Sequence, residues 1–129
     1  MDRIDKILNH DLFLYHLGRN NAAEADRRFC RHSMVHFLDV ARIGTIIALE
    51  EGLELDREWI YAAALLHDCG KHEQYENGTP HEQASARIAP EILKDCGFDD
   101  KETDVIVTAI SRHRDPEAAK EKNLNGVLY

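Results

Sequence analysis

Apolar residues recur along this chain at intervals of three and four positions, the spacing of amphipathic helices. The N-terminal stretch shows this spacing at Ile4, Leu8, Leu12 and Tyr15. The composition of residues 18–21, Gly-Arg-Asn-Asn, is typical of a turn. The pattern therefore predicts an N-terminal helix over residues 1–17, followed by a turn.

Two further segments are apolar on more than one face, so both should be buried near the centre of the fold. The first covers about residues 22–50 and should end at Gly52. The second begins with Asp56 as a cap, contains the apolar run 59–66, and closes at Gly70.

The second half of the chain carries clear helix-start signals. Thr79-Pro80-His81-Glu82 places Thr at the cap, Pro at the first helical position and Glu three residues after the cap. Later starts are expected at Asp99 and at Asp115-Pro116. With no alternating strand pattern, repeat or linker, the sequence predicts an all-α fold: one compact helical bundle of about five to seven helices over residues 1–129.

Composition narrows the function classes. The 129 residues are 43% hydrophobic and 31% charged, with no apolar run long enough for a membrane span. Three separated cysteines without a CxxC pair predict neither a disulfide framework nor a zinc ribbon, which favours a cytoplasmic protein. The net charge of −8 argues against binding a nucleic-acid duplex but allows a small anionic substrate held through a metal.

The pair His67-Asp68 follows Leu65-Leu66 at the end of a helix that should be buried. Burying these polar groups without partners would cost several kcal/mol. A metal is one solution, because imidazole nitrogen and carboxylate oxygen bind divalent Fe, Mn, Co, Ni or Zn. The other is that Asp68 caps a neighbouring helix while His67 bonds a carbonyl. The dipeptide alone favours neither.

Three more histidines, His36, His81 and His113, lie on three other predicted helices. Mixed His and Asp sets suit one or two transition metals, which can acidify a bound water. Spacing alone does not show that the four helices converge, so a metal centre is a hypothesis at this point.

Residues 67–71, His-Asp-Cys-Gly-Lys, resemble the signature of the HD superfamily of metal-dependent phosphohydrolases. His36, followed four and five residues later by Val40-Ala41, resembles the first motif of that family, and His81 and His113 lie in segments similar to its third and fourth. The order is kept between about residues 28 and 129. The later motifs most resemble the two-metal branch, which includes the YqeK-like hydrolases of symmetrical dinucleoside polyphosphates.

The resemblance implies an HD-type fold that binds one or two divalent transition metals, with Fe or Mn favoured, Ni or Co allowed and Zn disfavoured. It implies metal ligation by His36, His67, Asp68, His81 and His113. Asp68 would bridge two metals, a metal-bound hydroxide would attack phosphorus, and Lys71 would hold the phosphate.

Two-metal members also carry a final Asp after an apolar helix. Residues 124–129 resemble the approach to that segment, so we expect either a truncated C-terminus or a missing last ligand. Asp115 could substitute, but helix capping is the preferred interpretation.

A few other polar residues are candidates for contact with the substrate. His32 shares a helix face with His36, which slightly favours a place in the substrate pocket. Arg112 could meet an anionic substrate, although a surface salt bridge is the preferred interpretation. His10 and His16 are interpreted as ordinary surface or interface residues. His72 could approach substrate, but a solvated loop residue is the preferred interpretation.

The predicted function is hydrolysis of a phosphomonoester or phosphoanhydride, expected to be a nucleotide. The alternative is a non-catalytic nucleotide- or metal-binding module with an incomplete ligand set, and the least favoured hypothesis is a scaffold with incidental histidines. The expected partner is a small-molecule phosphate substrate, with no nucleic-acid duplex and no membrane, and a homo-oligomer is left open.

Overall fold

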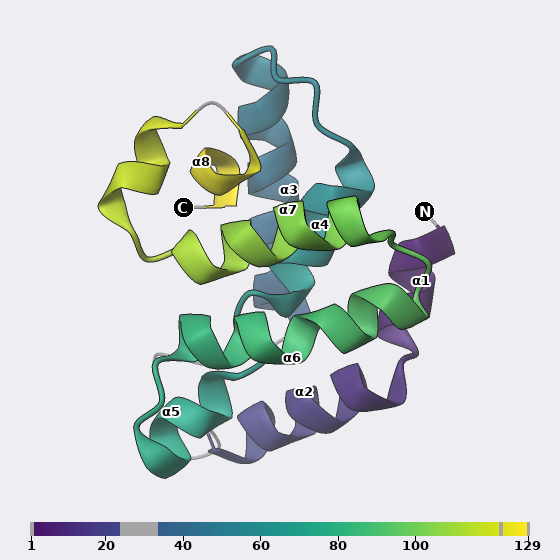
Figure 1. The fold of residues 1–129 in the computed structure, drawn as a ribbon, viewed down its shortest axis with the longest axis vertical. Helices are drawn as coiled ribbons and strands as arrows, with labels where there is room; N and C mark the ends of the chain where they lie inside the picture. Colours follow the sequence, from purple (N-terminus) through teal and green to yellow (C-terminus); the bar gives the residue numbers. More distant parts are fainter. Residues whose placement is uncertain (1, 24–33, 122, 129) are drawn as a thin grey trace.

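The computed structural model describes residues 2–23, 34–121 and 123–128, and these contain helices and no strand (Figure 1). The helices are α1 (Asp2–Leu8), α2 (Asp11–Ala23), α3 (Met34–Glu50), α4 (Arg57–Leu66), α5 (Lys71–Asn77), α6 (His81–Asp95), α7 (Asp100–Arg112), the 3₁₀ helix η1 (Pro116–Lys120) and α8 (Leu124–Leu128). None of these helices combines the length and the apolar character that crossing a bilayer requires. The predicted all-α fold is confirmed.

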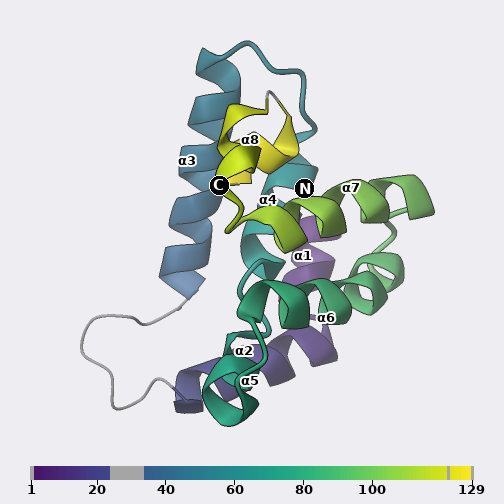
Figure 2. The ribbon, with the colours of Figure 1, turned by 60° about the vertical axis from the view of Figure 1, so that its left-hand side comes forward.

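Helix α4 lies at the centre of the fold and packs against α1, α3, α6, α7 and α8 (Figure 2). Residues 62–66 of this helix are buried on every side, as its unbroken apolar run predicts. The largest fully buried apolar side chains are Ile7, Phe13, Phe37, Leu65, Leu66, Ile92, Leu93, Ile106, Ile110 and Leu124. The core therefore surrounds α4, and the C-terminal end of α4 carries His67 and Asp68 into the interior.

The prediction of a turn at residues 18–21 is wrong, because α2 continues without a break to Ala23. Asn20 explains why a sequence with turn composition stays helical. Its side chain is fully buried and makes two hydrogen bonds to the segment between α4 and α5. Tertiary contacts thus outweigh the weak helix propensity of Gly and Asn here.

The predicted caps at Asp56, Asp99 and Asp115 are confirmed, since each side chain accepts a backbone N–H in the first turn of its helix. The predicted cap at Thr79 is wrong. Helix α6 begins at His81, and the Thr79 hydroxyl instead donates to Asn77 Oδ1 at 2.6 Å. The backbone N–H of His81 donates instead to Gln74 Oε1 on α5 at 3.1 Å.

Candidate metal centre

The turn between α4 and α5 carries His67 and Asp68 and is held from outside by α2. Asn20 Nδ2 donates to the backbone carbonyl of Asp68 at 3.0 Å, and Asn20 Oδ1 accepts the backbone N–H of His72 at 2.8 Å. Both ends of one buried amide therefore close the turn. Buried backbone groups need such partners, because each one left unpaired costs about 1–3 kcal/mol.

Helix α6 packs directly against the same turn. Ser85 Oγ accepts the backbone N–H of Gly70 at 2.9 Å. A Cβ placed on Gly70 would lie 2.6 Å from Ala84 Cβ and 2.7 Å from the Ser85 backbone nitrogen. Position 70 therefore requires glycine because the two backbones touch, and this contact brings the start of α6 beside Asp68.

His67 and His113 are positioned by the same kind of hydrogen bond to their own helix. Each is the C-cap of its helix, and each ring Nδ1 lies 2.6 Å from the carbonyl oxygen three residues earlier, Ala64 and Ile110 respectively. Carbonyls in the last turn of a helix lack intrahelical partners. A carbonyl only accepts, so both Nδ1 atoms carry the proton, and each Nε2 presents a lone pair beyond its helix end.

His81 approaches from the opposite end of a helix, as the first residue of α6. Its ring Nδ1 lies 2.7 Å from Gln74 Oε1, and its Nε2 lies 3.1 Å from His113 Nε2. Burial, followed by the charges of Lys71 and His113, lowers the pKa of His81 to about 4 against the opposing charges of Asp68 and Glu82. His81 is therefore neutral near pH 7.

The three Nε2 atoms converge on Asp68. Distances to the carboxylate are 3.2 Å from His67, 3.5 Å from His81 and 3.6 Å from His113. Atoms about 2.1 Å from a common ion, at tetrahedral or octahedral angles, lie about 3.0–3.4 Å from one another. The donor set and its spacing therefore fit a divalent transition metal.

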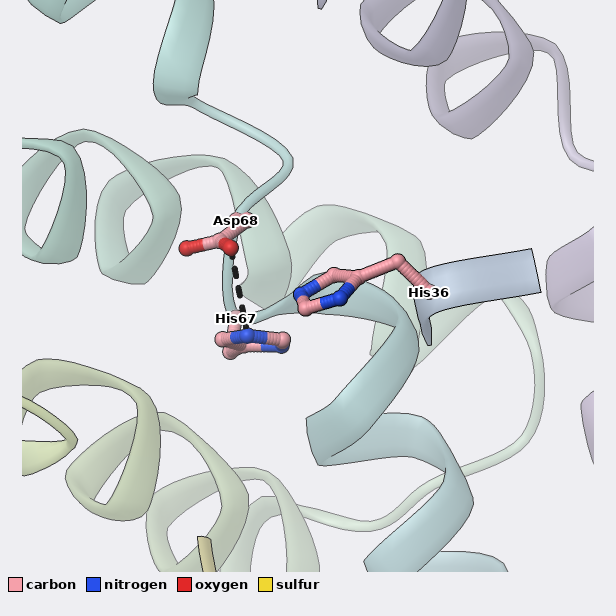
Figure 3. Close-up of side chains that lie close together, drawn as sticks. All are labelled: His36, His67 and Asp68. Atoms are coloured by element: carbon pink, nitrogen blue, oxygen red, sulfur yellow. Dashed lines mark ion pairs between the residues drawn. The ribbon is translucent and has the colours of Figure 1, made fainter. Parts of the chain in front are cut away.

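His36 completes a second group around the same carboxylate. The ring of this third residue of α3 extends toward His67 and Asp68 (Figure 3). His36, His67 and Asp68 form one set of mutually close donor atoms, and Asp68, His81 and His113 form another. One carboxylate thus belongs to both sets, an arrangement that suits two neighbouring ions.

The acceptor atoms gathered around Asp68 favour a positive charge among them. In the metal-free protein, a proton on His67 supplies part of that charge. Burial disfavours the charged form of His67, but the hydrogen bond and charge of Asp68, together with the Ala64 carbonyl, outweigh it and raise its pKa. A proton on His67 does not relieve the His81–His113 contact, where two Nε2 atoms face each other at 3.1 Å. That contact calls for a cation of its own.

The remaining sequence-predicted site residues divide into three cases. Lys71 lies at the site, with its Nζ 3.4 Å from His81 Nδ1. Arg112 points elsewhere and forms ion pairs with Asp115 and Glu121, as the salt-bridge interpretation expects. His32 lies outside the described residues.

Sequence reasoning misplaced two histidines. His72, expected in a solvated loop, is 4% exposed in the first turn of α5, and His16, expected at the surface, is 8% exposed. Their rings stack, with His16 Nδ1 2.8 Å from His72 Nε2. Both are buried because α2 packs against α5, and no local sequence pattern predicts this contact between helices.

Sequence reasoning also missed Asn20 and Gln74, whose amides hold the metal-site residues. The only sequence signal for these two residues was the high content of polar residues in segments predicted to be helix or turn. Cys69, expected to be a packing residue, is buried, and burial raises the pKa of its thiol to about 12. A thiol of that pKa is unsuited to act as a nucleophile.

Comparison with known proteins agrees with this geometry. The HD domain family profile matches residues 34–128, which include His36, His67, Asp68, His81 and His113. A protein of Clostridium beijerinckii, described as uncharacterized, is 47% identical over 129 residues, covering all of this chain and 80% of the relative. No solved structure matches. The chain belongs to the HD domain family, whose superfamily is one of metal-dependent phosphohydrolases.

Proposed function

We propose that this protein is a metal-dependent phosphohydrolase that cleaves a phosphomonoester or phosphoanhydride of a small molecule, with a nucleotide as the expected class. The observation that carries the proposal is the convergence of three imidazole Nε2 atoms on the Asp68 carboxylate within 3.6 Å. Family membership supplies the reaction class.

The five clustered residues would hold the metal as two overlapping sets that share Asp68. A bound divalent metal supplies Lewis acidity, lowers the pKa of a water and stabilises negative charge on phosphoryl oxygens. The protein directs the Nε2 lone pairs of His67 and His113 into the site, because each Nδ1–H donates to a carbonyl of its own helix. Fe or Mn is the proposed metal, followed by Ni or Co, since imidazole with carboxylate suits these ions.

We propose two cations, Lys71 and Arg114, as the residues that bind the substrate phosphate. Lys71 Nζ lies beside His81 and supplies a compact positive charge for a phosphate oxygen. Arg114 lines a polar depression of about 350 Å³ together with His81, Glu82, Gln74, Gly78 and Pro80. Arg112 is already engaged with Asp115 and Glu121. We therefore assign the anion-binding role expected of Arg112 to Arg114.

We also propose that residues 1–129 act as one domain, with α1 and α2 as part of its site. The family match begins at residue 34, yet Asn20 from α2 binds the backbone on both sides of the metal-site turn. Removing α2 would leave two buried backbone groups unpaired. The free thiols of Cys69 and Cys96 support the proposed cytoplasmic setting.

The test is metal analysis of the purified protein, followed by chromatography of the products formed from nucleoside mono-, di- and triphosphates and a dinucleoside polyphosphate. The Fe- or Mn-loaded protein should hydrolyse at least one of them, with release of phosphate from a terminal phosphate or of two nucleotides from the dinucleoside polyphosphate. The double variant His67→Ala, Asp68→Ala should lose both metal and activity, whereas His10→Ala, at a partly exposed residue paired with Asp95, should lose neither. Activity that survives the double substitution would overturn the proposal. Tight binding of metal and nucleotide without turnover would instead favour a binding module.

A further inference from the structure

Gln74 connects α5 to the first residue of α6 through a single oxygen. Its Oε1 accepts the backbone N–H of His81 at 3.1 Å and faces the His81 ring Nδ1 at 2.7 Å. It supplies the cap that Thr79 does not provide, and it holds the ring at the same time. One side chain therefore fixes both the start of α6 and the orientation of His81.

These two contacts determine which ring nitrogen carries the proton. The backbone N–H can only donate, so the Gln74 atom that faces it is the carbonyl oxygen and not the amide nitrogen. The same oxygen must then accept from the His81 ring, which places the proton on Nδ1. The Nε2 lone pair is left pointing toward Asp68 Oδ1 at 3.5 Å.

Lys71 opposes this arrangement. Its Nζ lies 3.4 Å from His81 Nδ1, and an ammonium group can only donate, so Lys71 favours a lone pair on Nδ1 and the proton on Nε2. A proton on Nε2 would block the atom that faces Asp68. The shorter contact to Gln74 decides the balance in favour of Nδ1–H.

His81 needs this help because of its place in the fold. His67 and His113 each stand at a helix C-terminus, where a carbonyl of their own helix receives the Nδ1 proton. A helix N-terminus exposes N–H groups and offers no such carbonyl. The Glu82 carboxylate of the same helix lies 3.6 Å from His81 Nδ1, beyond hydrogen-bond distance, so Gln74 on α5, at 2.7 Å, supplies the acceptor.

We propose that Gln74 is a positioning residue for the metal centre, one that fixes the His81 tautomer so that Nε2 is available as a ligand. This proposal rests on the proposed function of the same site. Partners of this kind, which hold a ligating histidine through its second nitrogen, typically change metal affinity 10- to 100-fold when they are removed. A stronger acceptor also makes the ring a better ligand.

The test uses two variants with opposite expectations. Gln74→Met keeps the length of the side chain but removes the acceptor, and Gln74→Glu keeps the acceptor and strengthens it. In metal-free protein, ¹⁵N NMR should show the Nδ1–H tautomer of His81 in the parent and in Gln74→Glu, and a loss of that preference in Gln74→Met. Calorimetric Mn²⁺ affinity should fall 10- to 100-fold in Gln74→Met and stay equal or rise in Gln74→Glu.

Gln83→Met is the matched control, an exposed position in the first turn of α6, and it should leave both measurements unchanged. An unchanged tautomer in Gln74→Met, or a Gln74→Glu variant that binds Mn²⁺ as weakly as Gln74→Met, would overturn the proposal. If Gln74→Met does not fold, Gln74→Glu still decides, because weaker Mn²⁺ binding there contradicts the role. Failure of the proposed function is distinguishable from failure of the Gln74 proposal, because in that case the parent protein itself binds no Mn²⁺ or hydrolyses none of the substrates.

Discussion

Two buried groups of histidines lie on either side of the turn between α4 and α5, and they solve the problem of burial differently. In the His16–His72 pair the two rings bind each other, with one nitrogen donating and the other accepting at 2.8 Å. In the metal-site cluster of His36, His67, Asp68, His81 and His113, three rings direct their Nε2 atoms toward one carboxylate. In the first group one nitrogen of each ring is satisfied inside the pair, whereas the second group brings several acceptor atoms together and favours a cation.

The difference lies in where each Nδ1 proton goes. In His67 and His113 it is given to a helix carbonyl, so the lone pairs are left to face one another. In the pair, His16 Nδ1 meets the partner ring directly. Burial of histidine is therefore a poor guide to metal binding by itself, whereas the direction of its hydrogen bonds is a good one.

The largest contrast should appear in thermal stability with and without metal. A ligand present at about 100 times its Kd adds about 2.7 kcal/mol to the free energy of unfolding. For a domain of this size that corresponds to roughly 10 °C in Tm. Mn²⁺ should therefore raise the Tm of the parent and of His16→Phe by this amount, and leave Asp68→Ala unchanged. Scanning calorimetry with and without a chelator measures it, and a His16→Phe variant that gains nothing from Mn²⁺ would break the contrast.

Asn20 joins the two groups, so its removal should affect both. Asn20→Ala leaves the Asp68 carbonyl and the His72 N–H without their partner, at about 1–3 kcal/mol each. We expect a loss of about 2 kcal/mol in urea unfolding, the lower end of that sum. Mn²⁺ binding should also weaken, because the Asp68 backbone is no longer held. Asn21→Ala is the matched control on the exposed side of α2 and should change unfolding by less than about 0.5 kcal/mol. Equal effects from the two substitutions would show that the buried amide has no special role.

These predictions also mark what the sequence could and could not supply. Caps at Asp56 and Asp99 depend on residues within one helical turn, so local pattern found them. His67 was recognisable because a polar pair directly follows Leu65-Leu66 in an apolar run. Such signals are local, and they survive folding because no tertiary contact opposes them.

The convergence of the metal-site cluster is not a local property. It depends on the close packing of Gly70 against Ala84 and on the path of α6, which spacing along the chain does not encode. Family resemblance, and not periodicity, brought His36, His81 and His113 together in advance. The misplaced residues share one cause: His16 and His72 were read as exposed because the packing of α2 on α5 was unknown.

Comparing the pH dependence of stability in the parent and in a His16 variant should isolate the contribution of the pair. Burial, and then the charges of His72, Arg87 and Arg19 against the opposing charge of Glu73, lower the pKa of His16 from 6.5 to about 4. The unfolded chain therefore binds this proton at a higher pH than the folded chain does. Stability from neutral His16 is complete above pH 6.5 and is lost as the pH falls toward 4.

Because of this shift, metal-free parent protein should lose about 2 kcal/mol more than His16→Phe between pH 7 and pH 5. Urea unfolding at a series of pH values measures the two slopes. Comparing slopes removes the constant cost of the substitution itself and the contribution that the other histidines make in both proteins. Parallel slopes would mean that folding does not lower the pKa of His16, because its ring is charged in the folded state or is as well solvated there as in the unfolded chain.

The smallest effect on Tm is expected at the solvent-exposed edge of the His16–His72 pair, where Glu76 lies. Glu76 forms an ion pair with Arg19 and lies 3.5 Å from His72 Nδ1 through its carboxylate. The Arg19 hydrogen bond lowers the pKa of Glu76 and so widens the pH range in which this carboxylate is charged. Exposed pairs contribute little and are screened by salt. Glu76→Gln should therefore shift Tm by no more than about 2 °C, with the difference shrinking further in 1 M NaCl, as calorimetry at two salt concentrations would show. A larger, salt-insensitive loss would mean that the buried pair depends on this carboxylate and is not satisfied by its own two rings.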